Sequence, residues 1–186
     1  MSEVNYEIVN IVASVKFEVE EPIDLKNMAK KNKDTTYNPH TFPGLIYRLQ
    51  IPKSTVLIFS NGRLVLTGLR KTKDVYSLTK KVLKVIRKYG TKIISEPEVK
   101  VQNIVASGDL HQNLNLDLMS MSLTITLYEP EVFPGLIYRL QNPKVVFLIF
   151  ANGKIVCVGA KLETDLKSAV AQLLEEIKGL GFNSKY

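Results

Sequence analysis

The sequence predicts an α+β fold made of two copies of one unit, in which each copy combines an antiparallel sheet with helices. Three observations support this prediction: an internal repeat, strand patterns joined by hairpin turns, and long segments with helical apolar spacing. Residues 42–50, which begin with a Phe-Pro-Gly turn, recur unchanged as residues 133–141. So long an identity indicates a duplication, and we expect two halves, 1–95 and 96–186, that form one body about a pseudo-two-fold axis.

The repeat extends well beyond this stretch. Residues 56–62 and 147–153 share Leu-Ile-Phe and, after one further residue, Asn-Gly, again at a displacement of 91 positions. Asn-Ile-Val-Ala-Ser occurs at 10–14 and again at 103–107, a displacement of 93 positions. The second copy has therefore lost two residues between its first strand and its Phe-Pro-Gly turn. A surface segment absorbs such a change easily.

The elements of the first half follow from local patterns. Runs of β-branched and aromatic residues predict strands at 8–17, 45–50, 55–60 and 63–67, and Asn61-Gly62 predicts the turn between the last two. A short helix is expected from residue 23 or 24 to 31, with Asp24 as its N-cap. Residues 32–41 contain Pro39 and are expected to form a loop. Helical apolar spacing predicts a long helix at 72–89, ended by Gly90 and followed by a short strand at 92–95.

The second half repeats this order after a boundary at Glu96-Pro97-Glu98. Strands are predicted at 99–110, 136–141, 145–151 and 154–158. A short helix is expected at 116–121, and the final helix is predicted at 163–178, ended by the glycines at 179 and 181. Each half is thus predicted to contain a strand, a short helix, further strands and a long helix.

Composition argues against several classes of protein. The chain is 45% apolar and 23% charged, which is typical of a globular protein, and no apolar run is long enough for a membrane helix. The single cysteine, Cys157, is interpreted as a small buried apolar residue. His40 and His111 have no neighbours at metal-ligand spacing and are assigned to the surface. Without a nucleophile, a metal cluster or a phosphate loop, we expect no enzyme, cofactor, metal site or membrane partner.

Charge is unevenly distributed along the chain. Residues 1–92 carry 17 Lys and Arg against 8 Asp and Glu, whereas residues 93–186 carry 8 against 10. The net charge of +7 suits a polyanionic partner, and it equally suits a solvated surface. Charge alone therefore does not decide between these two readings.

The predicted strands are apolar on both faces. Because alternate side chains point to opposite faces, Val56 and Ile58 share one face while Leu57 and Phe59 share the other. An antiparallel sheet covered on one side normally has polar residues on its other side. One apolar face is therefore left for a partner, and a second sheet or a homodimer interface is the alternative to a ligand.

The candidate open face combines apolar, amide and hydroxyl groups with cations at its edge. Its centre is predicted to contain Asn10, Val12, Leu57, Phe59, Val65 and Thr67, with Asn103, Val105, Leu148, Phe150, Val156 and Val158 as their counterparts. Phe42 and Phe133 lie at the strand-entry loops, and the edge carries Arg48, Arg63, Arg70, Arg139, Lys154 and Lys161. Cations that meet phosphates, amides that read base acceptors and aromatic rings that enter base steps suit a DNA minor groove.

At these residues the chain resembles the TATA-box-binding protein family. The resemblance covers residues 6–181 and rests on Gln-Asn-Ile-Val-Ala-Ser at 102–107, Tyr-Glu-Pro-Glu-Val-Phe-Pro-Gly-Leu-Ile-Tyr-Arg at 128–139 and Leu-Ile-Phe-Ala-Asn-Gly-Lys-Ile-Val at 148–156. It implies a saddle-shaped sheet of ten antiparallel strands, with four helices on the convex face and DNA on the concave face. The absence of a long N-terminal extension resembles the archaeal members, which implies a cytoplasmic, nucleoid-associated location, or a nuclear one in a eukaryote.

The resemblance also implies roles for individual residues in a non-enzymatic initiation factor that binds and bends double-stranded TATA-box DNA. The paired wedges would be Phe42 with Phe59 and Phe133 with Phe150. Base edges would be contacted by Asn10, Asn103 and Thr67, in a groove lined by Val12, Leu57, Val65, Val105, Leu148 and Val156. Val158 stands where the family usually has a second threonine, so that position loses a hydroxyl and keeps its shape.

Two protein partners are implied by the resemblance. Glu129, Glu131 and Val132 match the family's contact with transcription factor B, whereas the equivalent first-half loop has no acidic residue. Two acids at one end only would favour that end for a basic partner and could give transcription its direction. The RNA polymerase machinery is the further partner implied. The alternative is an interaction module whose open face forms a homodimer, either obligately or in the DNA-free protein.

Overall fold

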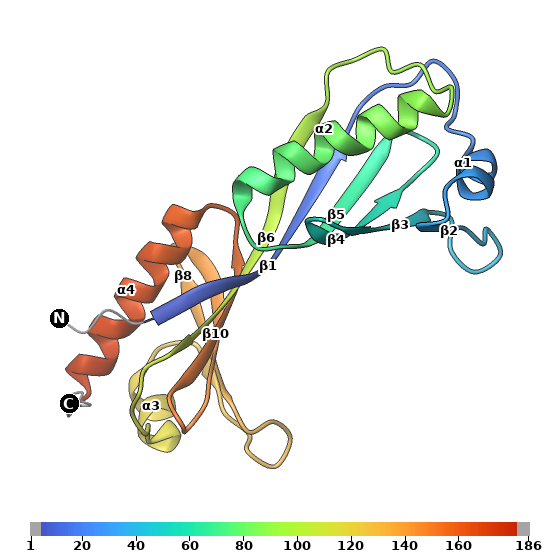
Figure 1. Cartoon of the computed structure of the whole chain (residues 1–186). Coiled ribbons are helices and arrows are strands. Elements are labelled where there is room, and N and C mark those ends of the chain that lie inside the picture. Colours follow the sequence, from blue (N-terminus) through green and yellow to red (C-terminus); the bar gives the residue numbers. More distant parts are fainter. Residues whose placement is uncertain (1–4, 182–186) are drawn as a thin grey trace. The chain divides into compact units, whose positions relative to one another are not determined.

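The computed structural model describes residues 5–181, and its strands form one antiparallel sheet in the order β2-β3-β4-β5-β1-β6-β10-β9-β8-β7. Across those residues the sheet has ten strands, accompanied by four helices (Figure 1). The predicted α+β class with a ten-stranded antiparallel sheet is therefore confirmed. No helix in this part of the chain is long and apolar enough to cross a membrane.

The same order of elements occurs in both repeats. The first repeat contains β1 (Asn5–Lys16), α1 (Leu25–Lys31), β2 (Thr35–Thr36), β3 (Leu45–Gln50), β4 (Lys53–Ile58), β5 (Arg63–Leu69) and α2 (Thr72–Lys88). The second repeat contains β6 (Glu98–Asp109), α3 (Leu116–Ser122), β7 (Thr126–Leu127), β8 (Leu136–Gln141), β9 (Lys144–Ile149), β10 (Lys154–Ala160) and α4 (Glu163–Gly179). The predicted sequence of strand, short helix, strands and long helix is thus present in each.

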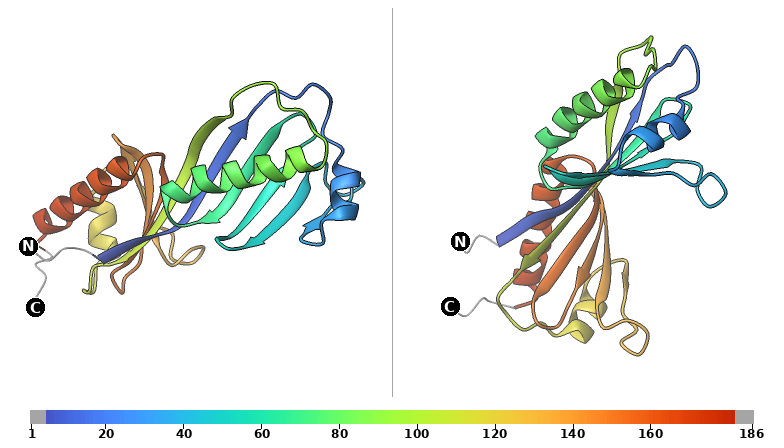
Figure 2. Two further views of the ribbon diagram at one scale, coloured as in Figure 1. Left: turned by 45° about the horizontal axis from the view of Figure 1, so that its top comes forward. Right: turned by 45° about the vertical axis from the view of Figure 1, so that its right-hand side comes forward.

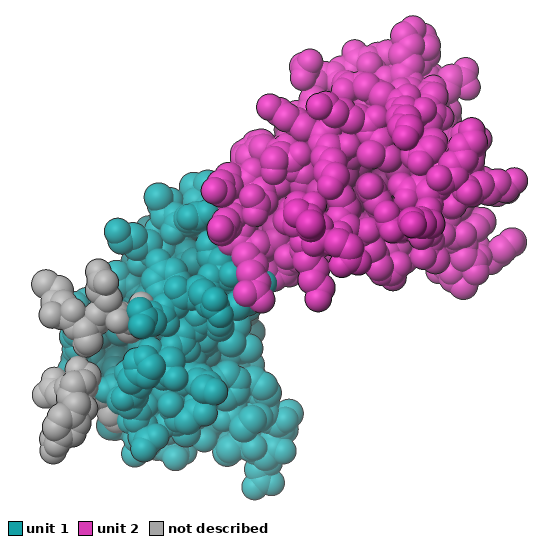
Figure 3. Space-filling model, in the orientation of Figure 1, with its two compact units in different colours: residues 1–9, 103–186 teal, residues 10–102 magenta. Residues whose placement is uncertain are grey.

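The chain divides into two compact units (Figure 3). Unit 2 comprises residues 10–102, and unit 1 comprises residues 1–9 together with 103–186. Strand β1 therefore begins in unit 1 and continues in unit 2 from Asn10, while β6 begins in unit 2 and continues in unit 1 from Asn103. In each repeat, the first residues of the first strand therefore belong to a different unit from the rest of that repeat.

In unit 2 one face of the strands packs against α2, which lies along them in Figures 1 and 2. Alternate strand residues are fully buried on this face, among them Ile11 and Leu66. Helix α2 contributes Val75, Leu78 and Val82 at helical spacing, and these side chains are also fully buried. Because burial of one such side chain contributes roughly 1.5–3 kcal/mol, this one-sided packing is a main source of stability for the unit.

Unit 1 repeats this arrangement with α4, whose Leu166, Ala169 and Leu173 are buried. Strand β10 places Cys157 in the same core. Burial raises the pKa of the Cys157 thiol to about 12, so the thiol stays protonated near neutral pH and is not a nucleophile. The interpretation of Cys157 as a small buried apolar residue is confirmed.

Each short helix begins with a side-chain cap. The Asp24 side chain accepts a hydrogen bond of 2.9 Å from the Asn27 backbone N–H, as the sequence predicted for α1. The Asn115 side chain accepts one of 3.0 Å from the Leu118 backbone N–H at the start of α3. The repeat therefore conserves the capping geometry with a different residue.

Some predicted elements were wrong. Residues 92–95 do not form a strand, because only the isolated bridge between Val19 and Ile93 is present there. Residues 32–41 were expected to be a loop, but Thr35 and Thr36 pair with β3 as β2, and β7 pairs with β8 in the same way. Strands of two residues carry no side-chain periodicity, so only the partner strand defines them.

Strands β5 and β10 run two residues past their predicted ends, because a bulge extends their pairing. Between Leu66 and Leu69, strand β5 has one more residue than the facing segment of β1. Gly68 lies in this bulge with a φ of 89°, a backbone conformation that glycine adopts at little cost. Gly159 has the same place in β10, with a φ of 107°.

The hairpin glycine predicted at Gly62 is required for steric reasons as well. Its φ is 79°, and its carbonyl accepts a hydrogen bond of 3.0 Å from the Phe17 backbone N–H. A Cβ atom at this position would lie 2.2 Å from the Phe17 carbonyl oxygen. The turn therefore tolerates no side chain without movement of the backbone.

We expect Gly62→Ala to destabilise the protein by clearly more than Gly90→Ala. Gly90 also has a positive φ, of 97°, but a Cβ there would meet nothing within 4 Å. The control therefore carries only the left-handed strain, about 1–2 kcal/mol, whereas Gly62→Ala adds the overlap with Phe17. Urea unfolding midpoints of the two variants measure the difference, and equal midpoints would contradict the steric argument.

Candidate nucleic-acid interface

The strand face opposite the long helix is half-buried in each unit. In unit 2 the predicted surface residues Asn10, Val12, Leu57, Phe59, Val65 and Thr67 are all half-buried, in alternation with fully buried residues. In unit 1 the same holds for Asn103, Val105, Leu148, Phe150, Val156 and Val158. The structure therefore places each predicted set together on the open face of its own unit.

A transverse apolar row crosses the open face and is identical in the two units. In unit 2 the strand register aligns Ile46 with Leu57, Leu57 with Val65, and Val65 with Ser14. In unit 1 the corresponding row contains Ile137, Leu148, Val156 and Ser107. Facing side chains in such a row are close enough to contact one another.

The next row differs between the units in its polarity. In unit 2 Thr55 lies opposite Thr67, and Arg48 extends the row. The equivalent row in unit 1 consists of Arg139, Val146 and Val158. The replacement of threonine by valine at 158 is thus accompanied by the same replacement at 146, so this row of unit 1 has lost both hydroxyl groups.

A hydrogen bond at each bulge fixes the orientation of the central asparagine. The Asn10 Oδ1 atom accepts from the Gly68 backbone N–H at 2.8 Å, and Thr67 Oγ1 lies 3.3 Å from the same oxygen. In unit 1, Asn103 Oδ1 accepts from the Gly159 backbone N–H at 2.8 Å. Within residues 5–181 neither asparagine donates from Nδ2 to another residue, so each amide N–H₂ group is available to an external acceptor.

Two phenylalanines form an edge-to-face pair in each unit. The ring centroids of Phe42 and Phe59 are 5.9 Å apart at 64°, and those of Phe133 and Phe150 are 5.8 Å apart at 66°. Gly44 makes this close pairing possible, since a Cβ there would lie 2.7 Å from Phe42 Cε1. All four rings are half-buried, so part of a large apolar surface remains in contact with water.

The six predicted cations are all exposed. Arg48 and Arg63 alternate with buried neighbours and therefore lie on the open face of unit 2, and Arg139 and Lys154 are their equivalents in unit 1. Arg70 and Lys161 follow directly after β5 and β10. All six charges are therefore solvated, and four of them share a strand face with the apolar rows.

The loops before the Phe-Pro-Gly turns share a backbone but differ in charge. Phe42 and Phe133 donate their backbone N–H groups to the carbonyls of Asn38 and Glu129, at 3.0 and 2.9 Å. Around this common turn, unit 1 exposes Glu129, Glu131 and Val132, and Val132 is 81% exposed. An acidic loop with an exposed apolar residue is therefore present in unit 1 only.

The sequence analysis missed part of the open face. Ile46, Thr55 and Ser14, with Ile137, Val146 and Ser107 in unit 1, share the rows with the predicted residues. The alternation within β3 and β4 could have revealed Ile46 and Thr55, but their place beside Leu57 and Thr67 depends on the register between strands.

The histidines do not form part of a cluster of potential metal ligands in the described part of the chain. His40 and His111 are exposed, as predicted, and residues 5–181 contain no group of three or more potential metal ligands. The open faces offer hydrogen-bond donors, apolar rows and cations, which are groups that can bind a ligand.

Comparison with known proteins identifies the family. The family model "Transcription factor TFIID (or TATA-binding protein, TBP)" matches twice, at residues 5–89 and 98–180. The TATA-box-binding protein of Pyrobaculum islandicum is 47% identical over 176 residues, which cover 95% of this chain and 87% of that protein. The protein of the same name from Archaeoglobus fulgidus is 44% identical over 183 residues, covering 97% and 99%.

A solved structure agrees with these matches. The Methanococcus jannaschii TBP is 42% identical, superposes with a TM-score of 0.83, and is matched over 94% of this chain and 99% of its own. The internal duplication seen in the sequence explains why one family model matches this chain at two places and why the sheet contains two similar sets of strands. The chain therefore belongs to the TATA-box-binding protein family of DNA-binding general transcription factors, and it is not an enzyme.

Proposed function

We propose that this protein binds TATA-box DNA in the minor groove through the open faces of both units, bends the duplex by insertion of phenylalanines, and recruits transcription factor B and RNA polymerase. The observation that carries the proposal is the open face itself. Each unit combines an apolar row, an amide N–H₂ group available to an acceptor, a half-buried phenylalanine pair and exposed cations.

The asparagines suit the acceptor pattern of A·T pairs. In the minor groove these pairs present only adenine N3 and thymine O2 acceptors, whereas G·C pairs add the guanine N2 donor. Because Gly68 and Gly159 hold the Oδ1 atoms, Asn10 and Asn103 would present donors and not acceptors. The apolar rows beside them would contact the edges of A·T pairs. At a G·C pair, the guanine amino group would face these apolar residues without a hydrogen-bond acceptor.

The phenylalanine pairs suit insertion between base steps. An apolar wedge partly unstacks a step and kinks the duplex, which exposes a wider groove to the protein. Phe42 with Phe59 would act in unit 2, and Phe133 with Phe150 in unit 1. Their edge-to-face packing supports this role because it holds each ring in one orientation before DNA binds.

The exposed cations would contact phosphates and position the duplex. This set contains Arg48, Arg63, Arg70, Arg139, Lys154 and Lys161. Groove contacts by Val12, Leu57, Val65, Thr67, Val105, Leu148, Val156 and Val158 would supply the preference for A·T sequences through shape.

The acidic loop of unit 1 is proposed as the contact for transcription factor B. Glu129 and Glu131 supply negative charge that suits a basic partner surface, and the exposed Val132 side chain supplies an apolar contact beside them. The equivalent loop of unit 2 lacks both acids. Only one end of the protein would therefore recruit the factor and, through it, the polymerase.

The half-buried apolar rows also favour a competing proposal, self-association of the DNA-free protein through the open face. Binding of a TATA duplex and of a matched G·C-rich duplex, measured by fluorescence anisotropy over a salt series, tests both proposals. We expect tighter binding to the TATA duplex at every salt concentration. Equal affinities would overturn the DNA proposal, and a dimer that DNA does not dissociate in sedimentation would favour the interaction module.

The central asparagine gives a prediction that separates folding from recognition. Asn10→Asp keeps an acceptor for the Gly68 N–H and should retain stability, but it replaces the outward donor with a charged acceptor, so TATA affinity should fall at least about tenfold. Asn10→Ala should lose affinity and also about 1 kcal/mol of unfolding free energy. Urea unfolding and anisotropy measure the two effects, and wild-type affinity in the Asp variant would contradict the donor assignment.

For the wedges, we expect Phe133→Ala and Phe150→Ala to reduce DNA bending more than they reduce non-specific binding at low salt, because non-specific binding depends on phosphates. Energy transfer between labels at the two ends of a duplex reports the bend. Tyr76→Ala, at an exposed position of α2, is the control and should leave the bend unchanged. An unchanged bend in both Phe variants would remove the wedge assignment.

Valine 158 allows a test of the missing hydroxyl. Val158→Thr should place a hydroxyl near Asn103 as Thr67 lies near Asn10, and it should tighten TATA binding by on the order of 1 kcal/mol. The reciprocal variant Thr67→Val should weaken binding by a similar amount. If Val158→Thr binds no more tightly than the wild type, unit 1 reads the groove by shape alone.

A further inference from the structure

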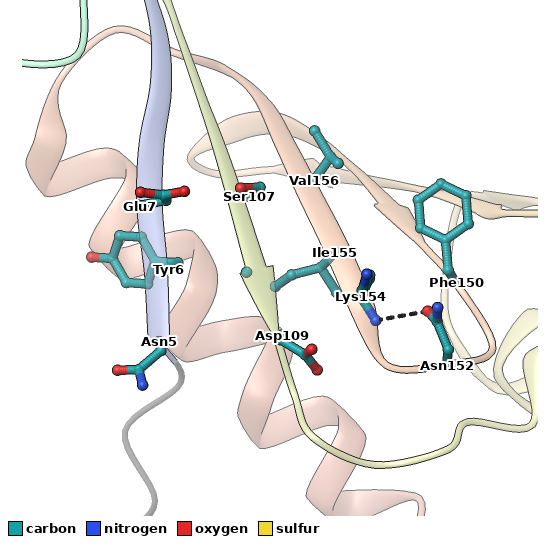
Figure 4. A pocket seen from close by; sticks show the side chains of 11 residues that line it. Asn5, Tyr6, Glu7, Ser107, Asp109, Phe150, Asn152, Lys154, Ile155 and Val156 are labelled. Carbon is teal, nitrogen blue, oxygen red and sulfur yellow. Dashed lines mark hydrogen bonds between the residues drawn. The ribbon is translucent and has the colours of Figure 1, made fainter.

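Each unit has a cavity at the same place in the repeat, beside the phenylalanine of the β-hairpin. The unit 2 cavity is lined by Ser14, Val15, Lys16, Phe59, Asn61, Arg63, Leu64, Val65, Glu98 and Lys100. The unit 1 cavity, shown in Figure 4, is lined by Asn5, Tyr6, Glu7, Ser107, Gly108, Asp109, Phe150, Asn152, Lys154, Ile155 and Val156. The two cavities thus occupy equivalent positions on the proposed DNA-binding faces.

Their apolar and amide residues agree, but their charged residues do not. The repeat equates Ser14 with Ser107, Phe59 with Phe150, Asn61 with Asn152 and Val65 with Val156. It also equates Lys16 with Asp109, Arg63 with Lys154, Glu98 with Asn5 and Lys100 with Glu7. The unit 2 cavity therefore carries three cations and one acid, whereas the unit 1 cavity carries one cation and two acids.

The strand register shows which of these charged residues lie opposite one another. Lys16 lies directly opposite Arg63 where β1 pairs with β5. Like charges in directly opposite positions destabilise a sheet. In unit 1 the same register position pairs Asp109 with Lys154, which is a favourable combination of charges. Unit 2 thus retains an unfavourable pair at a site where unit 1 has a complementary one.

The other residues of the unit 2 cavity do not neutralise this pair. Glu98 is held by Lys100, whose Nζ atom lies 2.6 Å from Glu98 Oε1. The Lys100 ammonium lowers the pKa of Glu98 through this hydrogen bond and its charge, and the charge of Lys16 lowers it further. In residues 5–181 no salt bridge involves Lys16 or Arg63. Lys16, Arg63 and Lys100 therefore share one carboxylate, Glu98, and the lining of the cavity keeps an excess of positive charge.

We propose that Lys16 and Arg63 together bind one phosphate group of the DNA backbone at the unit 2 cavity, whereas Lys154 in the equivalent cavity of unit 1 contacts its phosphate without a second cation. This inference rests on the proposed DNA binding. A phosphate between the two side chains removes their mutual repulsion, and the Arg63 guanidinium can bind it with two parallel hydrogen bonds. In unit 1, Asp109 and Glu7 oppose a phosphate beside Lys154.

The backbone of the bound duplex is then held unequally by the two units. Unit 2 contributes a doubly charged phosphate contact, and its second row contains threonines. Unit 1 has Asp109 in place of the second cation and valines in place of the threonines. Binding by unit 1 therefore depends more on shape and apolar contact, whereas binding by unit 2 depends more on salt concentration.

The test compares matched single variants in the salt dependence of binding to one TATA duplex. Each phosphate contact contributes about 0.9 to the slope of log K against log salt. Because Lys16 and Arg63 share one phosphate, we expect Lys16→Ala and Arg63→Ala each to flatten the slope by part of this amount, and Lys154→Ala to flatten it by less than either. Asp109→Ala should leave the slope unchanged or make it steeper. An unchanged slope for Lys16→Ala, or equal effects of Arg63→Ala and Lys154→Ala, would overturn the inference.

Thermal unfolding of the DNA-free variants at low salt provides a second readout. Lys16→Ala removes a repulsion and should keep or raise the unfolding midpoint, whereas Asp109→Ala removes an attraction and should lower it. A lower midpoint for Lys16→Ala with an unchanged salt slope would assign Lys16 a structural role and overturn the inference. If the wild-type protein does not prefer the TATA duplex, the proposed function is wrong. If it does prefer that duplex, the salt slopes of the variants test the phosphate site separately.

Discussion

One-sided packing of a long helix against the strands is the constraint on which the rest of the structure depends. Helices α2 and α4 bury one set of alternate strand residues in each unit, and neither of them covers the other set. The strands nevertheless carry apolar residues on both faces, so the second face remains only half-buried. The apolar rows, the phenylalanine pairs and the bulge asparagines all lie on this face, and the proposed recognition of DNA combines them with the exposed cations.

The bulges couple the fold to recognition. Gly68 and Gly159 turn a backbone N–H group out of the strand ladder, and that group holds the oxygen of the neighbouring asparagine. The amide is thereby oriented without a ligand, and its donor side faces outward. A site whose donors are fixed beforehand loses little conformational entropy when it binds, which favours the proposed contact with groove acceptors.

Duplication gave both units the same apolar row, and divergence has changed the polar positions around it. Thr55 and Thr67 correspond to Val146 and Val158, while Lys16 corresponds to Asp109. The acidic loop at Glu129 adds a third difference. All three changes leave the packing against the helices untouched, because they concern exposed or half-buried side chains. Two units of one fold can therefore differ in phosphate, base and protein contacts.

The sequence by itself determined the duplication, the fold class, the hairpin glycine, the Asp24 cap and most residues of the open face, because repeats, alternation and turn residues are local signals. Tertiary structure alone decided what depends on pairing between distant segments. It defined the two-residue strands β2 and β7, the exchange of strand segments between units, the rows that join Thr55 to Thr67, and the opposition of Lys16 and Arg63. Register and bulges are set by hydrogen bonds between strands, and no residue pattern within one strand encodes its partner.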